Sequence, residues 1–114
     1  MILGVGIDLI EVERIRKIYD RYKAHFLERV YTEDEVSYCI KKGVHIYECL
    51  AGRFAAKEAV IKATGGRIKS YKKIEILDTE YGPMVRIEGN ANYRLMVSIS
   101  HIKNLAMAIA IWEE

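Results

Sequence analysis

The spacing of apolar residues predicts helices in the first half of the chain and strands in the second. A short apolar segment over residues 2–7 is typical of a buried strand, and we expect it to end at Asp8. From Glu11 onward, apolar residues recur at helical spacing with charged residues between them, which predicts an amphipathic helix. Its apolar positions are Val12, Ile15, Ile18, Tyr19 and Tyr22.

Two further helices are predicted from the residues at their ends. Thr32 and Glu35 have the spacing of a capping box, so a helix should run over residues 33–42, with Gly43 as its stop. The longest helix is predicted over residues 47–64, where large apolar residues and alanines recur and a glycine pair follows.

After that glycine pair, apolar residues recur at every second position, as in a strand, and no longer at helical spacing. Strands are predicted over residues 73–78 and 84–88, around a turn at residues 81–83. A second hairpin is predicted over residues 95–101 and 105–112. Helices followed by antiparallel strands indicate an α+β fold, with the sheet packed against the long helix.

The last predicted strand is apolar on both faces. Met107, Ile109 and Ile111 point to one face, and three alanines at alternate positions point to the other, so we expect both faces to be covered. The long helix can cover one face. A neighbouring subunit can cover the other, which favours an oligomer; helices of the same chain are the alternative.

The composition indicates one soluble globular domain over residues 1–114. Half of the residues are hydrophobic (51%), which supports a packed core, and 18 basic against 16 acidic residues give a net charge of +2. This balance excludes a disordered tail or a histone-like polycation. The longest apolar run, residues 105–112, is far shorter than the roughly 20 residues that cross a bilayer.

Cys39 and Cys49 are too few for a disulfide scaffold and lack neighbouring zinc ligands. We therefore expect two free thiols in a reducing cytosol. The apolar start of the chain runs directly into Asp8, unlike a secretory signal, so a cytoplasmic location is expected.

The helix over residues 47–64 carries the most informative charges. Arg53 and Lys57 are four residues apart, as are Glu58 and Lys62, so each pair shares a helix face. Two solvated faces are one interpretation. The other is that a carboxylate with three cations, set among small alanines, binds a metal-bridged polyphosphate. Asp8, at a strand end, is by itself best explained as a cap of the following helix.

Two other segments contain residues that could serve a function. Ser98, Ser100 and His101 do not form a nucleophile elbow, and adjacent strand residues point to opposite faces, so a hydrolase is not indicated. Residues 12–29 contain six basic and three acidic residues. A solvated helix is the usual reason for such a run, yet this local excess also suits an acidic partner.

Taken together, four motifs resemble those of the holo-[acyl-carrier-protein] synthases, the small stand-alone 4′-phosphopantetheinyl transferases. They occur in the family's order, at compatible spacing, from the first strand to the final hairpin. They are Gly4-Val-Gly-Ile-Asp8-Leu-Ile-Glu11; Phe26-Leu-Glu-Arg29 with Tyr31-Thr-Glu-Asp-Glu35; Arg53-Phe-Ala-Ala-Lys57-Glu58-Ala with Lys62-Ala; and Ser98-Ile-Ser-His101.

The resemblance implies a phosphopantetheinyl transferase-like fold that assembles as a homotrimer, with active sites between subunits. It implies Mg²⁺-dependent transfer of 4′-phosphopantetheine from coenzyme A to a serine of apo acyl carrier protein, in fatty acid biosynthesis. Neither nucleic acid nor a membrane is an expected partner.

The resemblance also implies roles for individual residues. Asp8 and Glu58 match the metal ligands and, with Lys62, the catalytic set. Coenzyme A would be bound by Arg53, Lys57, Lys62, Ser100 and His101, with Arg53 or His101 coming from a neighbouring subunit. The acyl carrier protein would dock on Arg14, Arg21 and Arg29.

Two other classes of function are alternatives to the transferase. A small oligomeric binding module for acidic proteins or nucleotides would keep the basic helix without needing Asp8 and Glu58 together. A nucleic-acid-binding domain is disfavoured by the net charge of +2 and by tyrosines that are scattered along the chain.

Overall fold

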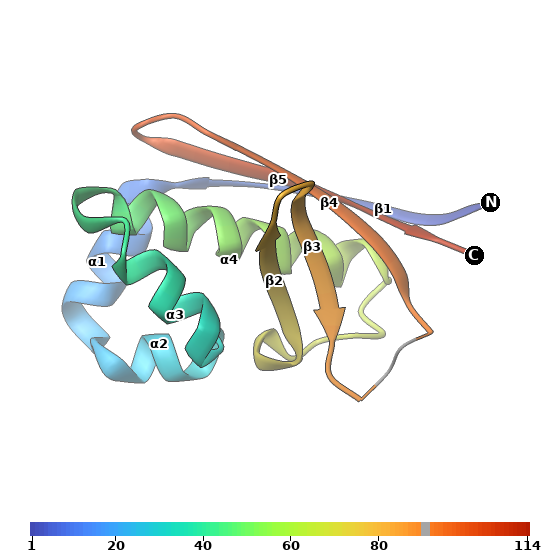
Figure 1. Cartoon of the computed structure of the whole chain (residues 1–114), viewed down its shortest axis with the longest axis horizontal. Helices are drawn as coiled ribbons and strands as arrows, with labels where there is room; N and C mark the ends of the chain where they lie inside the picture. Colours follow the sequence, from blue (N-terminus) through green and yellow to red (C-terminus); the bar gives the residue numbers. More distant parts are fainter. Residues whose placement is uncertain (90–91) are drawn as a thin grey trace.

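One long helix lies across one face of a five-stranded sheet in the computed structural model, which describes residues 1–89 and 92–114 (Figure 1). Neighbouring strands are antiparallel, in the order β1-β5-β4-β3-β2. The elements are β1 (Ile2–Glu11), α1 (Val12–Tyr22), α2 (Ala24–Val30), α3 (Glu33–Ile40), η1 (Gly43–His45), α4 (Ile46–Ala63), η2 (Tyr71–Lys73), β2 (Ile74–Thr79), β3 (Gly82–Ile87), β4 (Arg94–His101) and β5 (Leu105–Glu113). The predicted α+β class is therefore confirmed.

The helix ends form for the predicted reasons. The Thr32 hydroxyl accepts a hydrogen bond from the Glu35 backbone N–H at 3.3 Å, and the Glu35 carboxylate accepts one from the Thr32 N–H at 2.8 Å. This is the reciprocal capping box that the spacing predicted for α3. Gly43 has a φ of 60°, a backbone conformation that suits glycine, and it separates α3 from α4.

The first strand is longer than predicted. β1 does not end at Asp8 but continues to Glu11, because β5 supplies paired backbone along its length, with Asp8 opposite Ala108. Asp8 is therefore a strand residue, and the interpretation as a helix cap is wrong; Glu11 occupies the N-cap position of α1 without a side-chain hydrogen bond. The short helix α2 was not predicted.

The sheet packs closely against α4 because small residues line the contact. Ala106, Ala108 and Ala110 of β5 are buried on the face toward the helix. A Cβ atom added at Gly6 of β1 would overlap the carbonyl oxygen of Ala59, which lies in α4. Glycine is thus required there for its size, and it brings the β1 backbone against the α4 backbone.

The opposite face of the sheet is apolar and exposed. Its exposed side chains are Val5, Ile7, Leu9, Met84, Met96, Met107 and Ile109. In the part of the chain that the structure describes, the helices lie on the α4 side of strands β1, β5 and β4 (Figure 1). The alternative that helices of the same chain cover both faces of the last strand is therefore wrong.

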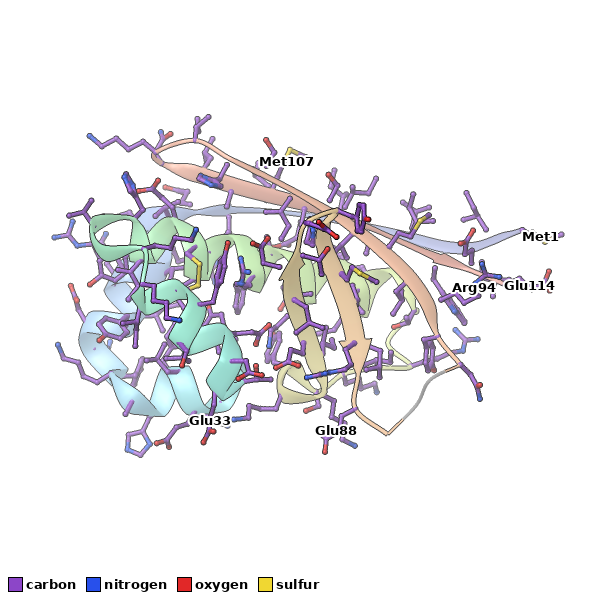
Figure 2. All side chains as sticks on the ribbon, viewed as in Figure 1. Met1, Glu33, Glu88, Arg94, Met107 and Glu114 are labelled. Atoms are coloured by element: carbon purple, nitrogen blue, oxygen red, sulfur yellow. A yellow bond between two sulfur atoms is a disulfide. The ribbon has the colours of Figure 1, made fainter. Side chains whose placement is uncertain are left out.

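Cys39 and Cys49 form a disulfide, so the expectation of two free thiols is wrong (Figure 2). Cys39 lies on α3 and Cys49 on α4, and the chain folds back between them through η1. Their Cα atoms are 5.4 Å apart, a separation that a disulfide spans. Two cysteines ten residues apart do not reveal this on their own, because the pairing depends on the angle between two helices.

Among the described residues, none of the helices combines the length and the apolar character needed to span a bilayer.

We predict that Gly6→Ala lowers the free energy of unfolding by about 3 kcal/mol, because the new methyl group meets backbone atoms that cannot move aside. Gly52→Ala in α4 is the control. Its methyl group would meet only the tip of the Ile99 side chain at 3.1 Å, so its effect should be below about 1 kcal/mol. Denaturant unfolding measures both, and equal stabilities of the two variants would contradict the close β1–α4 contact.

We also predict that a reductant lowers the free energy of unfolding by about 2–3 kcal/mol, because it opens the short loop between Cys39 and Cys49. The double variant Cys39→Ala/Cys49→Ala is the control and should unfold identically with and without reductant. Two titratable thiols in the unreduced, unfolded wild-type protein would show that this prediction is wrong.

Candidate functional site

One carboxylate from β1 and one from α4 lie close together where these two elements are in contact. Asp8 comes from β1 and Glu58 from α4. Lys62, one turn after Glu58, donates to a carboxylate oxygen of Asp8 at 3.2 Å and to the carbonyl oxygen of Ile7 at 2.9 Å. The structure thus places Lys62 with Asp8 across two elements rather than in an ordinary helix pair with Glu58.

The pKa of the Asp8 carboxyl depends on its burial and on the charged groups around it. Burial raises the pKa of the Asp8 carboxyl, and the hydrogen bond and charge of Lys62 partly offset this effect. The negative charge of Glu58 raises the Asp8 pKa further, whereas Arg14 of α1 lowers it. Glu58, Lys62 and Arg14 are therefore all close enough to affect the charge state of Asp8.

Tyr71 of η2 completes this cluster, and no motif or spacing in the sequence predicts it. Its hydroxyl donates a hydrogen bond to the Oε1 atom of Glu58. Its ring stacks on Phe54 of α4, with ring centroids 5.6 Å apart. Burial, the hydrogen bond to Glu58 and the charges of Glu58 and Asp8 raise the pKa of Tyr71 to about 12. The phenol therefore keeps its proton at neutral pH.

The donor atoms of Asp8 and Glu58 suit a hard divalent cation. Mg²⁺ binds one or two carboxylates and completes its coordination with waters and substrate phosphates. Within residues 1–89 and 92–114, no group of three or more histidine, cysteine or acidic side chains could hold a metal by itself. The pair fits a Mg²⁺ ion held jointly by the protein and a phosphate ligand, and does not form a closed structural metal site.

A separate cleft of about 370 Å³ lies where α4 meets β4. Arg53 and His101, both predicted as binding residues, line it. The Arg53 guanidinium lies 4.2 Å from the centre of the Tyr38 ring, and its buried Nε atom lacks a hydrogen-bond partner in the described part of the chain. A buried guanidinium with an unused donor is suited to an anionic ligand.

Sequence reasoning missed several residues of this cleft. The Glu48 carboxylate lies between two imidazoles, 3.2 Å from Nδ1 of His45 and 4.0 Å from Nδ1 of His101. Tyr38 and Lys42 form another wall. Only the folding of α3 against α4 brings these residues to Arg53.

Ser100 is exposed and lies opposite Met107 of β5.

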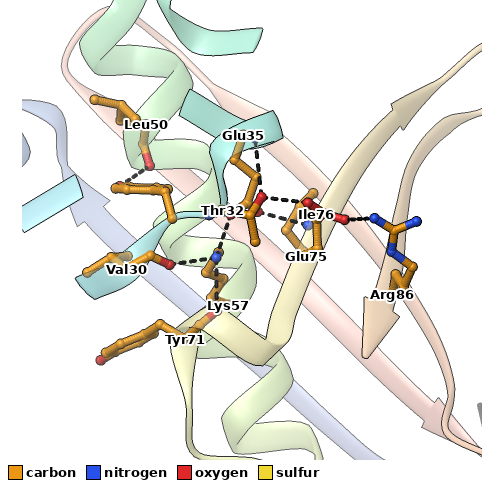
Figure 3. Close-up of polar contacts among 10 residues, drawn as sticks. Val30, Thr32, Glu35, Leu50, Lys57, Tyr71, Glu75, Ile76 and Arg86 are labelled. Carbon is orange, nitrogen blue, oxygen red and sulfur yellow. Dashed lines mark hydrogen bonds and ion pairs between the residues drawn. The ribbon is translucent and has the colours of Figure 1, made fainter. Parts of the chain in front are cut away.

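Lys57 lies in the core and not in the cleft (Figure 3). Its ammonium group forms an ion pair with Glu35 at 2.6 Å and donates to the carbonyl oxygens of Val30 and Tyr71 at 2.6 and 2.9 Å. Burial lowers the pKa of Lys57, and the charge and hydrogen bond of Glu35 partly offset this effect. The structure therefore uses the Lys57 charge inside the protein and leaves it no free donor face toward a bound nucleotide.

The basic residues of the first helices flank the carboxylate cluster. Arg14 and Arg21 are exposed on α1, and Arg29 of α2 lines a groove of about 550 Å³ together with Tyr71. The groove and the cleft divide the predicted residues between them: Arg29 lines the groove with Tyr71, and Arg53 and His101 line the cleft.

Comparison with known proteins agrees with this arrangement. Residues 4–110 match the model of the 4′-phosphopantetheinyl transferase superfamily. A holo-[acyl-carrier-protein] synthase of Halothermothrix orenii is 46% identical over 125 residues, which cover 100% of this chain and 99% of that protein.

Solved structures agree as well. The crystal structure of a holo-[acyl-carrier-protein] synthase from Neisseria meningitidis has a TM-score of 0.90 with 28% identity and full coverage of both chains. The synthase from Bacillus anthracis, solved in complex with CoA (3′,5′-ADP), has a TM-score of 0.85 with 39% identity, covering 98% of this chain and 96% of that one. The chain therefore belongs to the 4′-phosphopantetheinyl transferase superfamily and, within it, to the holo-[acyl-carrier-protein] synthases.

Proposed function

We propose that this protein transfers the 4′-phosphopantetheine group of coenzyme A to a serine of apo acyl carrier protein, with Mg²⁺, as a step of fatty acid biosynthesis in the cytoplasm. The observation that carries the proposal is the meeting of Asp8 and Glu58, with Lys62 beside them, at the β1–α4 contact. The bound CoA of the Bacillus anthracis relative supports coenzyme A as the substrate.

The reaction is a displacement at phosphorus. The serine oxygen of the carrier forms a bond to the β-phosphorus of coenzyme A, and the bond to the bridging oxygen of the pyrophosphate breaks. Adenosine 3′,5′-bisphosphate leaves with that oxygen, and the serine proton passes to Glu58 or to a water that it orients. Asp8 and Glu58 are the residues that would hold Mg²⁺, which supplies charge neutralisation at the phosphates.

Lys62 is suited to stabilise the negative charge of the leaving group. Its side chain is half-exposed, with 52% of its surface accessible. Among the described residues, the Asp8 carboxylate and the Ile7 carbonyl oxygen bind its ammonium group. It can therefore turn toward a phosphate oxygen and stabilise the charge that develops as the bisphosphate leaves.

The cleft at Arg53 is the proposed nucleotide site, with His101 at its edge. Ser100, the neighbour of His101 on β4, lies opposite Met107 on the other face of the sheet and does not line this cleft. The unused Nε donor of Arg53 supports binding of the 3′-phosphate there. Lys57, buried with Glu35, is not part of this site in our proposal; its role is structural.

A homotrimer would complete the active site. The exposed apolar face of β1 and β5 is of the kind that subunit contacts cover. Within one chain, the carboxylate cluster and the cleft are distinct, so a neighbouring copy can supply Arg53 and His101 to the Asp8–Glu58 pair. The 114 residues act as one domain in this proposal.

Arg14, Arg21 and Arg29 are the proposed docking residues for the carrier protein. All three are exposed, and Arg29 lines the groove that borders Tyr71. Their charges suit an acidic protein surface.

Intact-mass spectrometry of an apo acyl carrier protein tests the proposal directly. After incubation with this protein, coenzyme A and Mg²⁺, the carrier should gain the mass of one phosphopantetheine group, and EDTA should abolish the gain. No gain with several folded carrier proteins would instead favour a binding module without catalysis.

We predict that Glu58→Gln lowers kcat about 100-fold or more and leaves the Kd for the carrier protein unchanged, because it removes a metal ligand but no docking residue. Stopped assays give kcat, and isothermal titration gives the Kd. Glu80→Gln, at an exposed turn, is the matched control and should behave as wild type. Equal losses of turnover and carrier affinity would count against the assignment of Glu58.

We predict that Arg21→Ala raises the KM for the carrier protein about 3- to 10-fold and flattens its dependence on salt, because one charge of the docking surface is lost. Arg94→Ala removes the same charge from the far end of the sheet (Figure 2) and should leave this KM unchanged. A change confined to the KM for coenzyme A would show that α1 is not the docking surface.

A further inference from the structure

We propose that Tyr71 is a positioning residue that holds the carboxylate of Glu58 in the orientation used for the reaction. The inference rests on the proposed function and deepens it, because it concerns the same carboxylate pair. Tyr71 lies in η2, thirteen residues after Glu58, and belongs to none of the four motifs that carry the resemblance in the sequence.

The first observation is the hydrogen bond from the Tyr71 hydroxyl to Oε1 of Glu58. Asp8 already has a partner in Lys62. In the described part of the chain, Tyr71 provides the corresponding hydrogen bond to Glu58. A glutamate side chain has three rotatable bonds, so a donor at one oxygen restricts the directions in which the other oxygen can point.

The second observation is that Tyr71 is itself held from two sides. Its ring stacks on Phe54, with an angle of 30° between the planes. Its backbone carbonyl accepts a hydrogen bond from the ammonium group of Lys57, which is buried and paired with Glu35 (Figure 3). Because a buried ammonium group must keep its partners, this contact fixes the backbone at Tyr71. The buried Lys57–Glu35 ion pair therefore helps to position the Glu58 carboxylate, because Lys57 holds the backbone of Tyr71.

The third observation is the place of Tyr71 between two functional surfaces. The residue lines the groove that contains Arg29, and its hydroxyl points to Glu58. A residue at this junction can hold the carboxylate still while a carrier protein occupies the groove. Groups that hydrogen-bond to metal-binding carboxylates typically affect metal affinity or activity 10- to 100-fold.

Tyr71→Phe tests this role, because it removes the hydroxyl and keeps the ring that stacks on Phe54 and the backbone carbonyl that Lys57 binds. We expect kcat to fall about 10-fold, with the KM for the carrier protein unchanged. In a separate titration without carrier protein, the affinity for Mg²⁺ in the presence of coenzyme A should also fall about 10-fold, as measured by calorimetry.

Tyr31→Phe is the matched control. It also removes a tyrosine hydroxyl that makes a hydrogen bond, in this case to the carbonyl oxygen of Leu50 in the core at 2.8 Å. Because this hydrogen bond is structural, Tyr31→Phe should lower the melting temperature and leave kcat and the Mg²⁺ affinity unchanged. Tyr71→Phe should show the reverse: lower kcat and Mg²⁺ affinity at an unchanged melting temperature.

A double-mutant cycle separates this inference from the proposed function. If Tyr71 acts through Glu58, Tyr71→Phe should have no further effect in a Glu58→Gln background, whether activity or Mg²⁺ affinity is measured. Unchanged kcat and Mg²⁺ affinity in Tyr71→Phe, a loss of folding, or an undiminished effect in the Glu58→Gln background would each overturn the inference. Wild-type protein that binds Mg²⁺ with coenzyme A but transfers nothing would overturn the proposed function alone.

Discussion

The close approach of strand β1 to helix α4 is the contact on which the site depends. Asp8 and Glu58 are fifty residues apart in sequence, and they meet only because two backbones lie against each other. Gly6 provides the space on the strand, and alanines provide it on the helix and on β5. The same small residues that make the packing tight therefore also set the distance between the two carboxylate groups.

The regular elements could be predicted from the sequence because their signals are local. The capping box at Thr32 and Glu35, the alanine-rich helix and the two hairpins all depend on residues within a few positions of one another, and all are present. The turn of the first hairpin is tighter than the predicted residues 81–83, because Gly82 and Pro83 already pair with β2. The assignment of Asp8, Glu58 and Lys62 came from the resemblance to a family, since charge spacing on one helix cannot reveal a partner on a distant strand. The structure does place these three residues together.

What the sequence did not reveal depends on the angles between elements. The local signal favoured Asp8 as a helix cap, but pairing with β5 extends β1 beyond it. Cys39 and Cys49 pair because α3 folds back on α4. Lys57 has the spacing of a surface cation, yet the position of α3 supplies Glu35 and makes burial possible. Tyr71 has no motif at all, and only the fold brings its hydroxyl to Glu58.

The pairing of β1 with β5 also governs when the site can form. In the part of the chain that the structure describes, β1 lies at one edge of the sheet and pairs with β5 alone. During synthesis, residues Ile2–Glu11 are made well before their partner Leu105–Glu113, because the helices and three strands lie between them in the sequence. Contacts between such distant segments form late and slowly. The pairing that extends β1 past Asp8 therefore forms only after the intervening helices have been made, so the two carboxylates of the site are brought together late in folding.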